Sequence, residues 1–496
     1  MHLTKSKYIS GIKCERKLWY DVRDPIFKKS APGSPAYIGT RVGVAAQSLF
    51  PGGVVVSEGP RQHREALKKT RAFLNDVSVP AIFEGAFEHD GVRIRVDILE
   101  KISDGRWNLI EVKSSKNESA LLDKYGADAG VQLYVCRNSG LDVKNVKIMH
   151  VNGDYIYPGE EICWADFLKE TDITQHCESI QEEIRENVLR FSRLIEDDFL
   201  PEAIPTKNRC TDCHYTCRCW EGLPDDWIQL LPNVNYLQVE ELAAKGIHRM
   251  SELTDELSLK PLQERVKSVT MTGDPWVSKG LSSALKEFQP PVYYLDFETM
   301  NPAIPLFIGT KPHERVPFQY SLMFMDERFQ LSIIDDFIAR VGDDPRRPLA
   351  EALIKSIPDD DHPILAHSAV SVEAKIIEAL ADKYDDLAVK LLKIRDRVKD
   401  TQPLIKNHVY FKSFGGSFSI KTVSKELGGD FGYSYNKLED VQIGTDASYA
   451  YWEMCDLGKE DPQKIENLIE YCRTDVGVLA GVHKRLFEIS NKNEKN

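Results

Sequence analysis

Acidic residues spaced two apart on apolar strands are the first features of this 496-residue chain that could do chemistry. In WNLIEVK, strand alternation puts Glu111 and Lys113 on one face, and a hairpin can bring Asp97 beside them. In VYYLDFE, Asp296 and Glu298 share a face in the same way. Such carboxylates bind divalent cations, which generate hydroxide and offset charge in phosphodiester hydrolysis, while a nearby ammonium can position the attacking water.

Taken alone, each pattern has an ordinary explanation, because a D…ExK pattern also fits an exposed strand edge with an ion pair. The context of the second pattern is more informative. In IEYCRTDVGVLAGV, Tyr471 and Asp475 stand one turn apart on an amphipathic helix, so they share a face. A helix packed across the strand ends would present Asp475 to the same metal ions, with Tyr471 beside the water. Between them, HPILAHSAVSVEAKIIEAL is an apolar strand running into a helix that begins near Glu373.

Four of the ten cysteines are crowded into RCTDCHYTCRCW. In a reducing compartment, such crowding indicates a metal site rather than disulfides. Four thiolates suit an iron-sulfur cubane, and they also suit zinc, so the spacing alone does not choose between the two.

Together these residues resemble the RecB-type PD-(D/E)xK nucleases, particularly the iron-sulfur branch that includes AddB and the CRISPR-associated RecB-like exonucleases. In that branch one upstream and three downstream cysteines hold a 4Fe-4S cluster that joins the two ends of the domain. The resemblance implies that the cluster ligands here are Cys14, Cys210, Cys213 and Cys219. Cys217 is left as a spare that could replace one of them, and zinc stays open as the alternative metal.

The same family suggests two more site residues. Glu84 in AIFEGAF could join the metal shell, and Gln132 could hold substrate or the lysine loop, although a strand end and a polar helix face are equally ordinary roles. One departure concerns a metal-binding histidine that many relatives carry in the helix before the core. The corresponding stretch GTRVGVAAQSLF has none, which leaves open a differently arranged metal shell or an inactive site.

The second set resembles the DEDD exonucleases of the DnaQ class, built on a ribonuclease H-like sheet, over residues 291–488. Asp296 and Glu298 match the first motif, and Tyr471 with Asp475 matches the third in its tyrosine version. The resemblance implies two-metal hydrolysis with Mg²⁺ or Mn²⁺, in which the tyrosine orients the nucleophile.

The middle motif departs from the family. Val372-Glu373 stands where relatives have a Phe-Asp pair, so that Glu373 is the expected third carboxylate. His367 or Ser368 lies near the usual asparagine position. Asp400 is an alternative fourth carboxylate, with capping as its simpler role.

The elements expected to position these residues alternate between helix and strand, which predicts an α/β chain. Strands are expected at 81–87, 92–99, 107–112 and 146–151, and helices at 10–20, 39–49, 128–137 and 471–487, with a long charged helix over 166–196. In VEELAAKGIHRMSEL, Gly246 separates two short amphipathic stretches, as in a helix-hairpin-helix that holds a nucleic-acid backbone. A plain connector is the simpler interpretation of that segment.

We therefore expect three parts. Residues 1–222 would form a PD-(D/E)xK, restriction-endonuclease-like domain with the cluster, residues 223–289 a small helical connector, and residues 290–496 a ribonuclease H-like DEDD exonuclease domain. The dipeptide Pro290-Pro291 marks the last boundary. This order of parts also resembles a prokaryotic family that joins the two nuclease types.

Composition limits the partners. No apolar run is long enough to cross a bilayer, and the N-terminus lacks the apolar core of a signal peptide, so we expect a cytoplasmic protein without a membrane partner. The net charge of −13 argues against coating nucleic acid by bulk attraction. It does not argue against a nuclease, because metal-binding carboxylates make active sites acidic.

The resulting expectation is a metal-dependent nuclease acting on DNA, at ends or on single strands, in repair, defence or CRISPR-linked processing. An RNA-processing exonuclease is the first alternative, since nothing in the sequence reads a 2′-hydroxyl. The second is a nucleic-acid-binding scaffold in which one or both sites are inactive. Protein partners are not indicated.

Overall fold

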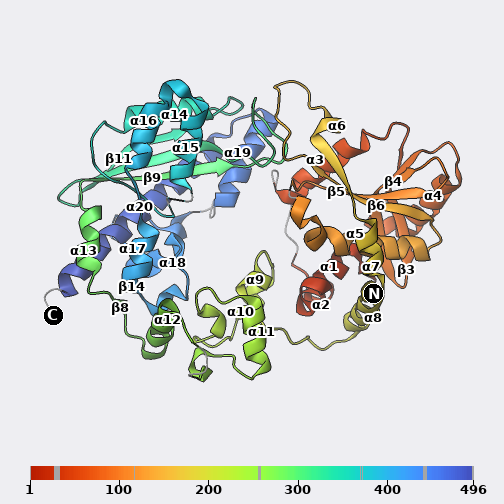
Figure 1. Cartoon of the computed structure of the whole chain (residues 1–496), viewed down its shortest axis with the longest axis horizontal. Helices are drawn as coiled ribbons and strands as arrows, with labels where there is room; N and C mark the ends of the chain where they lie inside the picture. Colours follow the sequence, from red (N-terminus) through yellow and green to blue (C-terminus); the bar gives the residue numbers. More distant parts are fainter. Residues whose placement is uncertain are drawn as a thin grey trace. The chain divides into compact units, whose positions relative to one another are not determined.

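The computed structural model describes residues 2–26, 34–116, 118–254, 258–368, 370, 372–429, 431–438 and 444–493. The chain is of mixed α/β type, as expected, and divides into two compact units (Figure 1). Unit 1 comprises Met1–Glu221 and Pro302–Glu314, and unit 2 comprises Gly222–Asn301 and Arg315–Asn496. In the described part of the chain, no helix is both long and apolar enough to span a bilayer.

These units differ from the three expected parts in two ways. The break after Glu221 lies one residue from the expected end of the first domain, but the expected connector 223–289 belongs to unit 2. A short segment inside the expected third domain, Pro302–Glu314, belongs to unit 1.

Unit 1 is built on a seven-stranded mixed sheet of order β2-β3-β4-β5-β6-β7, with β1 paired to β4. Strands β3, β4 and β5 are mutually antiparallel neighbours, whereas β5 and β6 are parallel and are joined through helix α5. The strands are β1 (Leu3–Thr4), β2 (Val54–Val55), β3 (Ala81–His89), β4 (Val92–Lys101), β5 (Trp107–Lys113), β6 (Val143–Val151) and β7 (Leu168–Asp172).

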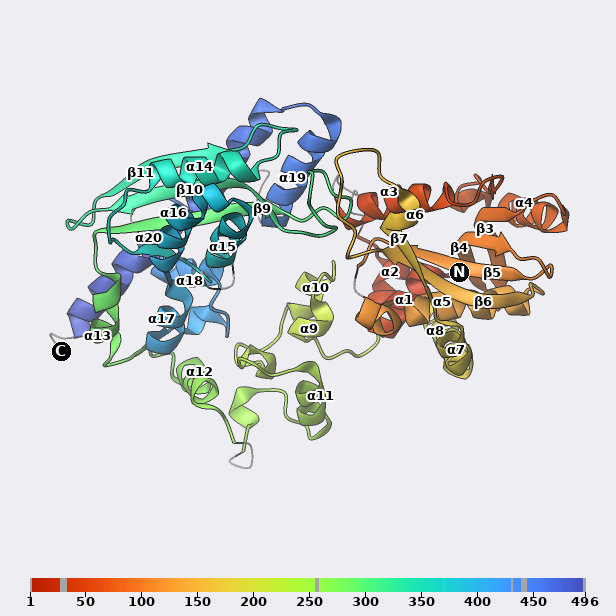
Figure 2. The ribbon, with the colours of Figure 1, turned by 45° about the horizontal axis from the view of Figure 1, so that its top comes forward.

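Helix α5 packs on β3, β4 and β6 and is covered by α7 and α8, which makes it the central helix of unit 1 (Figure 2). The helices are α1 (Lys5–Lys13), α2 (Glu15–Arg23), α3 (Pro35–Gln47), α4 (His63–Asn75), α5 (Leu121–Asn138), α6 (Trp164–Phe167), α7 (Thr174–Ser179), α8 (Gln181–Glu196), α9 (Lys207–Cys210) and α10 (Thr216–Trp220), with 3-10 turns η1 (Pro60–Gln62) and η2 (Glu118–Ala120).

The predicted helix over 166–196 is wrong at residues 168–173. Residues 168–172 form β7, which pairs antiparallel with β6, and helix resumes only at α7 and α8. The segment LKETD has one buried residue, Leu168, and exposes most of the others. A polar strand at the sheet edge therefore has the composition of a solvated helix, and local pattern does not separate them.

Unit 2 contains a five-stranded sheet of order β11-β10-β9-β12-β13. The β11-β10-β9 part is antiparallel, and β9, β12 and β13 are parallel. A small two-stranded sheet stands apart from it. The strands are β8 (Trp276–Val277), β9 (Val292–Met300), β10 (Val316–Met325), β11 (Leu331–Ile338), β12 (Ile364–Ala366), β13 (Val398–Asp400) and β14 (Val409–Tyr410).

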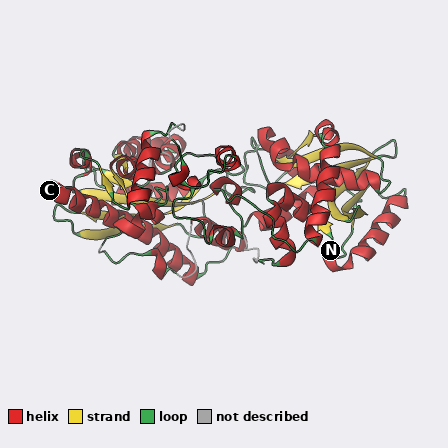
Figure 3. Cartoon of the chain, turned by 90° about the horizontal axis from the view of Figure 1, so that it is seen from below, coloured by secondary structure: helices red, strands yellow, loops and turns green. Residues whose placement is uncertain are grey.

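Helices cover both faces of this sheet, and the colouring in Figure 3 separates them from the strands. The helices of unit 2 are α11 (Tyr236–Ala244), α12 (Pro261–Thr272), α13 (Leu281–Leu285), α14 (Arg346–Ser356), α15 (Glu373–Lys383), α16 (Asp385–Asp396), α17 (Thr401–His408), α18 (Ile420–Leu427), α19 (Gly444–Leu457) and α20 (Pro462–Asn493), with 3-10 turns η3 (Ile228–Leu230), η4 (Met250–Glu252), η5 (Lys286–Phe288), η6 (Lys412–Phe414) and η7 (Tyr435–Lys437).

Alternation along β9 decides which face carries the chemistry. Tyr293, Leu295 and Phe297 pack into the core beneath α14, α15 and α16. Val292 and Tyr294 pack on the opposite face, against α20. Because successive side chains alternate, the two acidic residues that follow Tyr294 in the even positions lie on the α20 face.

A helix-hairpin-helix does not form around Gly246. Helix α11 precedes it, but only the three-residue turn η4 follows. Gly246 takes a left-handed conformation with φ of 77°. The carboxylate of Glu252 then accepts the backbone N–H groups of His248 and Arg249 at 2.7 and 3.0 Å, which closes the turn and leaves no second helix N-terminus for a ligand.

Candidate active sites

The ExK strand of unit 1 places its side chains as alternation predicts. Lys113 Nζ donates a hydrogen bond to Glu111 Oε1 at 2.5 Å. Asp97 on β4 lies beside them, since its Oδ2 accepts the backbone N–H of Val112 at 2.8 Å. The three residues of the D…ExK pattern therefore meet in one buried cluster on neighbouring strands.

Helix α5 adds two more members to this cluster. Gln132 Nε2 donates to Glu111 Oε2 at 2.6 Å, so the expected glutamine reaches the carboxylate directly. Asp128, one turn earlier, accepts from Lys113 Nζ at 2.6 Å and was not anticipated. The sequence could have indicated Asp128, because residues four apart share a helix face and Gln132 was already assigned to the site.

A second lysine enters from the other end of the domain. Lys5, the first residue of α1, donates to both carboxylate oxygens of Glu111 at 2.9 and 3.2 Å, and its Nζ lies 3.6 Å from Asp128 Oδ1. The pairing of β1 with β4 brings α1 to this position. Sequence reasoning missed Lys5, since nothing near it in the chain marks it as different from other lysines.

Burial and charge set the protonation of this cluster. Burial, and then the charge of Glu111, raises the pKa of Asp97 from 3.8 to about 7. Burial opposes ionisation of Glu111 as well, but Lys5 and Lys113 outweigh it and hold the pKa of this carboxyl well below its usual range. Glu111 is therefore the ionised centre of the cluster, and Asp97 is the carboxylate most easily protonated.

Glu84 lies at the margin of the cluster. It is half-buried on β3 in a left-handed conformation with φ of 57°. Burial raises the pKa of its carboxyl, and the charges of Arg95 and Lys5 oppose that rise. Glu84 thus lies within electrostatic range of the site, and the charge of Glu111 adds to the rise of its pKa.

Two of the expected cluster ligands, Cys213 and Cys219, each lie within electrostatic range of the other two, Cys14 and Cys210. Burial raises the pKa of the Cys213 thiol, and the charges of Cys210 and Cys14 add to the rise. Burial and the charges of the same two neighbours also raise the pKa of the Cys219 thiol, and Arg16 opposes this rise. Cys217 is exposed. Cys14, at the junction of α1 and α2, therefore lies within electrostatic range of Cys213 and Cys219, some 200 residues downstream.

Aromatic and polar contacts join these two ends of unit 1. The rings of Tyr20 and Tyr215 stack with centroids 4.9 Å apart, and Tyr215 Oη donates to Asp21 at 2.8 Å. Arg16 Nε donates to the carbonyl of Pro201 at 2.8 Å. The cysteine-bearing segment is thus docked on α2 by contacts that need no metal.

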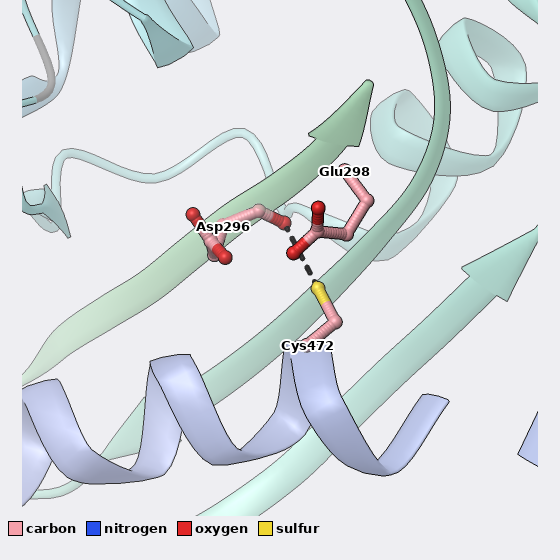
Figure 4. A group of neighbouring side chains, drawn as sticks. All are labelled: Asp296, Glu298 and Cys472. Carbon is pink, nitrogen blue, oxygen red and sulfur yellow. Dashed lines mark hydrogen bonds between the residues drawn. The ribbon is translucent and has the colours of Figure 1, made fainter. Parts of the chain in front are cut away.

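In unit 2, Asp296 and Glu298 face α20. Ligand atoms of Asp296, Glu298 and Cys472 all lie within 4.8 Å of one another, and Figure 4 shows these side chains converging from β9 and α20. The Cys472 thiol lies 3.6 Å from the Asp296 carbonyl oxygen, to which it donates. Cys472 was not anticipated, because a cysteine between Tyr471 and Asp475 reads as an ordinary core residue.

The remaining acids approach the same point. Burial raises the pKa of Asp296 well above its usual value, and the charges of Asp475, Glu298 and Glu373 raise it further. Burial also raises the pKa of Glu373 to about 7, with a hydrogen bond to Asp296 opposing. The four expected carboxylates of unit 2 therefore lie close enough to repel one another when ionised.

Two residues that sequence reasoning missed hold the helix side of this site. Tyr435 Oη donates to Asp475 Oδ1 in a short hydrogen bond. Lys421 Nζ donates to Tyr471 Oη at 3.0 Å and lies over the rings of both tyrosines at 4.9 to 5.0 Å. Tyr471 and Asp475 are thus held in place by partners from η7 and α18.

The neighbours of the middle motif have structural roles. Asp400 caps α17, accepting the N–H groups of Gln402 and Ser368 at 2.9 Å each, so its simpler interpretation is confirmed. The ring of His367 lies between Thr401 Oγ1 and the Phe418 carbonyl oxygen. Within the described part of the chain, neither residue hydrogen-bonds to the four carboxylates, although the charge of Asp400 contributes to the raised pKa of Glu373.

Comparison with known proteins adds one match. A family model described as "Domain of unknown function (DUF2779)" matches residues 293–419. This range includes Asp296, Glu298 and Glu373 and ends before Tyr471 and Asp475. No curated protein matches the chain.

Proposed function

We propose that this chain is a divalent-metal-dependent nuclease that hydrolyses phosphodiester bonds at two sites, one in each unit. The observation that carries the proposal is the convergence of Asp296, Glu298, Glu373 and Asp475 from three separate elements of unit 2. Buried like charges are costly unless protons or cations neutralise them. A site that gathers four carboxylates and little positive charge is suited to metal ions.

An orphaned oxygen supports the fit of a cation in unit 2. Glu373 Oε2 is buried and has no hydrogen-bond partner among the described atoms. Bound Mg²⁺ or Mn²⁺ would supply the hydroxide and stabilise the leaving oxygen. The protein's own part is to aim the carboxylates, with Tyr435 fixing Asp475, and to place the Tyr471 hydroxyl where it can orient the attacking water.

For unit 1 we propose a PD-(D/E)xK-type site. Asp97 and Glu111 would hold the ion, Lys113 would position the water, and Gln132 would fix the orientation of Glu111. Hydrogen bonds of Glu111 to Lys113 and Gln132 support these roles.

A second candidate function for unit 1 is favoured by Lys5. Its ammonium and that of Lys113 both bind Glu111, so two positive charges already neutralise the carboxylate that a metal ion would need. No histidine fills the ligand position that many relatives of this type have. On this view unit 1 binds nucleic acid, and hydrolysis belongs to unit 2.

The cysteines fit an iron-sulfur cluster or zinc, and we propose a 4Fe-4S cluster. The charges of Cys14 and Cys210 raise the thiol pKa values of Cys213 and Cys219, which supports proximity of the four proposed ligands. The group would join the first and last helices of unit 1. Visible thiolate-to-iron absorbance that disappears in Cys213→Ala, as unit 1 loses stability, would separate it from zinc.

We further propose DNA as the substrate and the cytoplasm as the location, with a role in repair, defence or CRISPR-linked processing. RNA is the alternative substrate, because the two-metal chemistry does not distinguish the polymers.

Degradation of end-labelled DNA and RNA with Mg²⁺ or Mn²⁺ tests the proposal. Asp296→Ala should remove the activity of unit 2, Lys113→Ala that of unit 1, and the double variant all of it. The exposed residues Glu327 and Lys144 offer matched controls, because Glu327→Ala and Lys144→Ala remove the same kinds of charge at the surface. Full activity in the double variant would refute both site assignments.

A further inference from the structure

A pocket of about 750 Å³ opens in unit 1 beside the Glu111 cluster. Its walls come from the first turn of α1, from β3 and β4, and from the segment around η1. Lys5 and Glu84 belong both to these walls and to the surroundings of Glu111. A group bound in the pocket would therefore lie next to the candidate hydrolytic carboxylates.

Four positive side chains line this pocket, Lys5, Lys7, Arg93 and Arg95, against the two carboxylates of Glu58 and Glu84. Arg95 donates to the backbone carbonyls of Glu84 at 3.1 Å and Glu58 at 2.7 Å, and the charges of both carboxylates act on its guanidinium. Lys7 also lines the pocket and, within the described part of the chain, has no ion-pair partner. Arg93, a third member, pairs with Glu88.

The backbone adds to this positive character. Helix α1 is nine residues long and begins at the pocket, with Thr4 as its N-cap accepting the N–H of Lys7 at 3.3 Å. First-turn N–H groups lack intrahelical partners, and the positive end of the helix dipole favours anions there. Side chains and backbone thus agree on an anionic ligand.

Size limits what this anion can be. About 750 Å³ lies within the range of small-molecule pockets, roughly 300–1,000 Å³, so the space suits a terminal nucleotide and not a duplex. We propose that the pocket binds the terminal phosphate of a single nucleic-acid strand and places the adjoining phosphodiester at Glu111. The inference rests on the proposed function of unit 1 and names its substrate: a strand with a phosphorylated end.

Binding without hydrolysis tests this proposal. Fluorescence anisotropy of the full-length protein in chelator would compare single-stranded oligonucleotides with a phosphate or a hydroxyl at the 5′ end, and separately at the 3′ end. One phosphorylated end should bind about tenfold more tightly than its hydroxyl counterpart, since a charge-assisted hydrogen bond contributes about 1.5 kcal/mol or more. Inorganic phosphate should compete for this difference.

Variants on one helix provide the control. Lys7→Ala should abolish the preference for the phosphorylated end, and Lys7→Arg should keep it. Lys13→Ala removes the same charge at the exposed end of α1, outside the pocket, and should leave the preference intact. The inference would be overturned if the wild type bound phosphorylated and hydroxyl ends equally tightly. It would also be overturned if Lys7→Ala and Lys13→Ala changed the preference for the phosphorylated end equally.

The cleavage assay separates this inference from the proposed function of unit 1. If Lys113→Ala retains all activity of unit 1 while the Lys7-dependent preference persists, hydrolysis in unit 1 is refuted and the phosphate pocket stands. If Lys113→Ala loses activity and no end preference exists, the pocket is refuted and hydrolysis stands.

Discussion

The lysine beside Tyr471 gives the unit 2 site a feature that its motif residues do not contain. Lys421 Nζ donates to the tyrosine hydroxyl at 3.0 Å, and this hydroxyl in turn hydrogen-bonds to Asp475. The Tyr471 hydroxyl is therefore held between the ammonium of Lys421 and the carboxylate of Asp475. Lys421 acts through Tyr471 and is a positioning residue.

Replacing Lys421 should lower activity without unfolding the protein. We expect Lys421→Met to reduce kcat of unit 2 by about tenfold to a hundredfold, corresponding to roughly 1.4–2.7 kcal/mol, when measured in a Lys113→Ala background. Since the two residues act as one unit, Lys421→Met combined with Tyr471→Phe should cost little more than either alone. Lys425→Met, exposed on the same helix, is the control. Additive losses would mean that Lys421 acts independently of Tyr471.

The pKa of Asp97 predicts a pH-dependent stability. Its folded value of about 7 lies above the usual 3.8, so protonated Asp97 contributes stability below about pH 4, and this contribution is lost as pH rises through 7. Asparagine imitates the protonated form at every pH. In chelator, the stability of Asp97→Asn relative to the wild type should therefore increase by about 1 kcal/mol or more as the pH rises from 5 to 8.

Hydrogen exchange in the strands of unit 1 at both pH values would measure this difference. Asp104→Asn is the control, because Asp104 is an exposed acid on the β4–β5 turn. If the difference in stability between Asp97→Asn and the wild type were the same at pH 5 and at pH 8, the raised pKa would be contradicted.

Sequence patterns identified the residues whose partners are local and missed those whose partners are distant. Glu111 and Lys113 follow from alternation on one strand, and Gln132 from the family motif. Lys5 reaches Glu111 across 106 positions, and Tyr435 reaches Asp475 across 40. A lysine or tyrosine has no local sign of such a contact, because only the packing of α1 or η7 creates it.

At the scale of elements, α20 depends on two glycines one turn apart. A Cβ on Gly477 would lie 2.2 Å from the ring of Tyr433, and one on Gly481 would lie 2.8 Å from the backbone nitrogen of Gly429. A side chain can move, but the backbone of Gly429 cannot move without shifting the chain that follows α18. Because it has no side chain, Gly481 allows α20, which carries Asp475, to lie close to the backbone of Gly429.

Gly481→Ala should consequently destabilise unit 2 by about 1–3 kcal/mol, the usual range for overpacking, and lower its nuclease activity. Gly43→Ala is an informative control of opposite sign. Gly43 lies within α3, where a Cβ would meet nothing within 4 Å, so alanine should stabilise by about 0.5–1 kcal/mol through helix propensity. Urea unfolding of both variants measures the two effects, and a neutral Gly481→Ala would show that α20 can shift freely.

Which elements could be predicted follows from their burial. The strands at 81–87, 92–99, 107–112 and 146–151 were found because their cores are apolar, and the structure extends each by a few residues. Strand β7 was missed because edge pairing with β6 needs little apolar surface. At η4 the sequence left both a helix-hairpin-helix and a plain connector open, since side-chain capping by Glu252, and not periodicity, shapes that segment.

At the scale of the whole molecule, one segment belongs to a different unit from the residues that flank it in the chain. Pro302–Glu314 follows strand β9 directly, yet it belongs to unit 1. Its composition gave no sign of this, because the contacts involved use mostly backbone groups. Boundaries read from composition, such as Pro290-Pro291, mark where local pattern changes and not where the units divide.

The contacts of this segment within unit 1 lie close to the ExK strand. His313 binds the carbonyl oxygen of Ser114 at 2.7 Å, and Lys116 Nζ donates to the Pro312 carbonyl at 3.0 Å. Tyr157 exchanges two backbone hydrogen bonds, donating to Thr310 at 3.0 Å and accepting from Gly309 at 2.8 Å. Ser114 and Lys116 lie one and three residues after Lys113, the last residue of β5, so the segment stabilises the end of this strand.

Replacing residues 306–313 by a glycine-serine linker of equal length in the full chain should therefore loosen unit 1. Each hydrogen bond contributes about 1 kcal/mol, so four lost contacts should speed amide exchange around Tyr157 and at the end of β5. Amides of β12, buried in the sheet of unit 2, should exchange as before. A glycine-serine replacement of the exposed residues 458–460, between α19 and α20 of unit 2, is the control. Unchanged exchange around Tyr157 would contradict a role of the segment in unit 1, and faster exchange in β12 alone would show that it stabilises unit 2 instead.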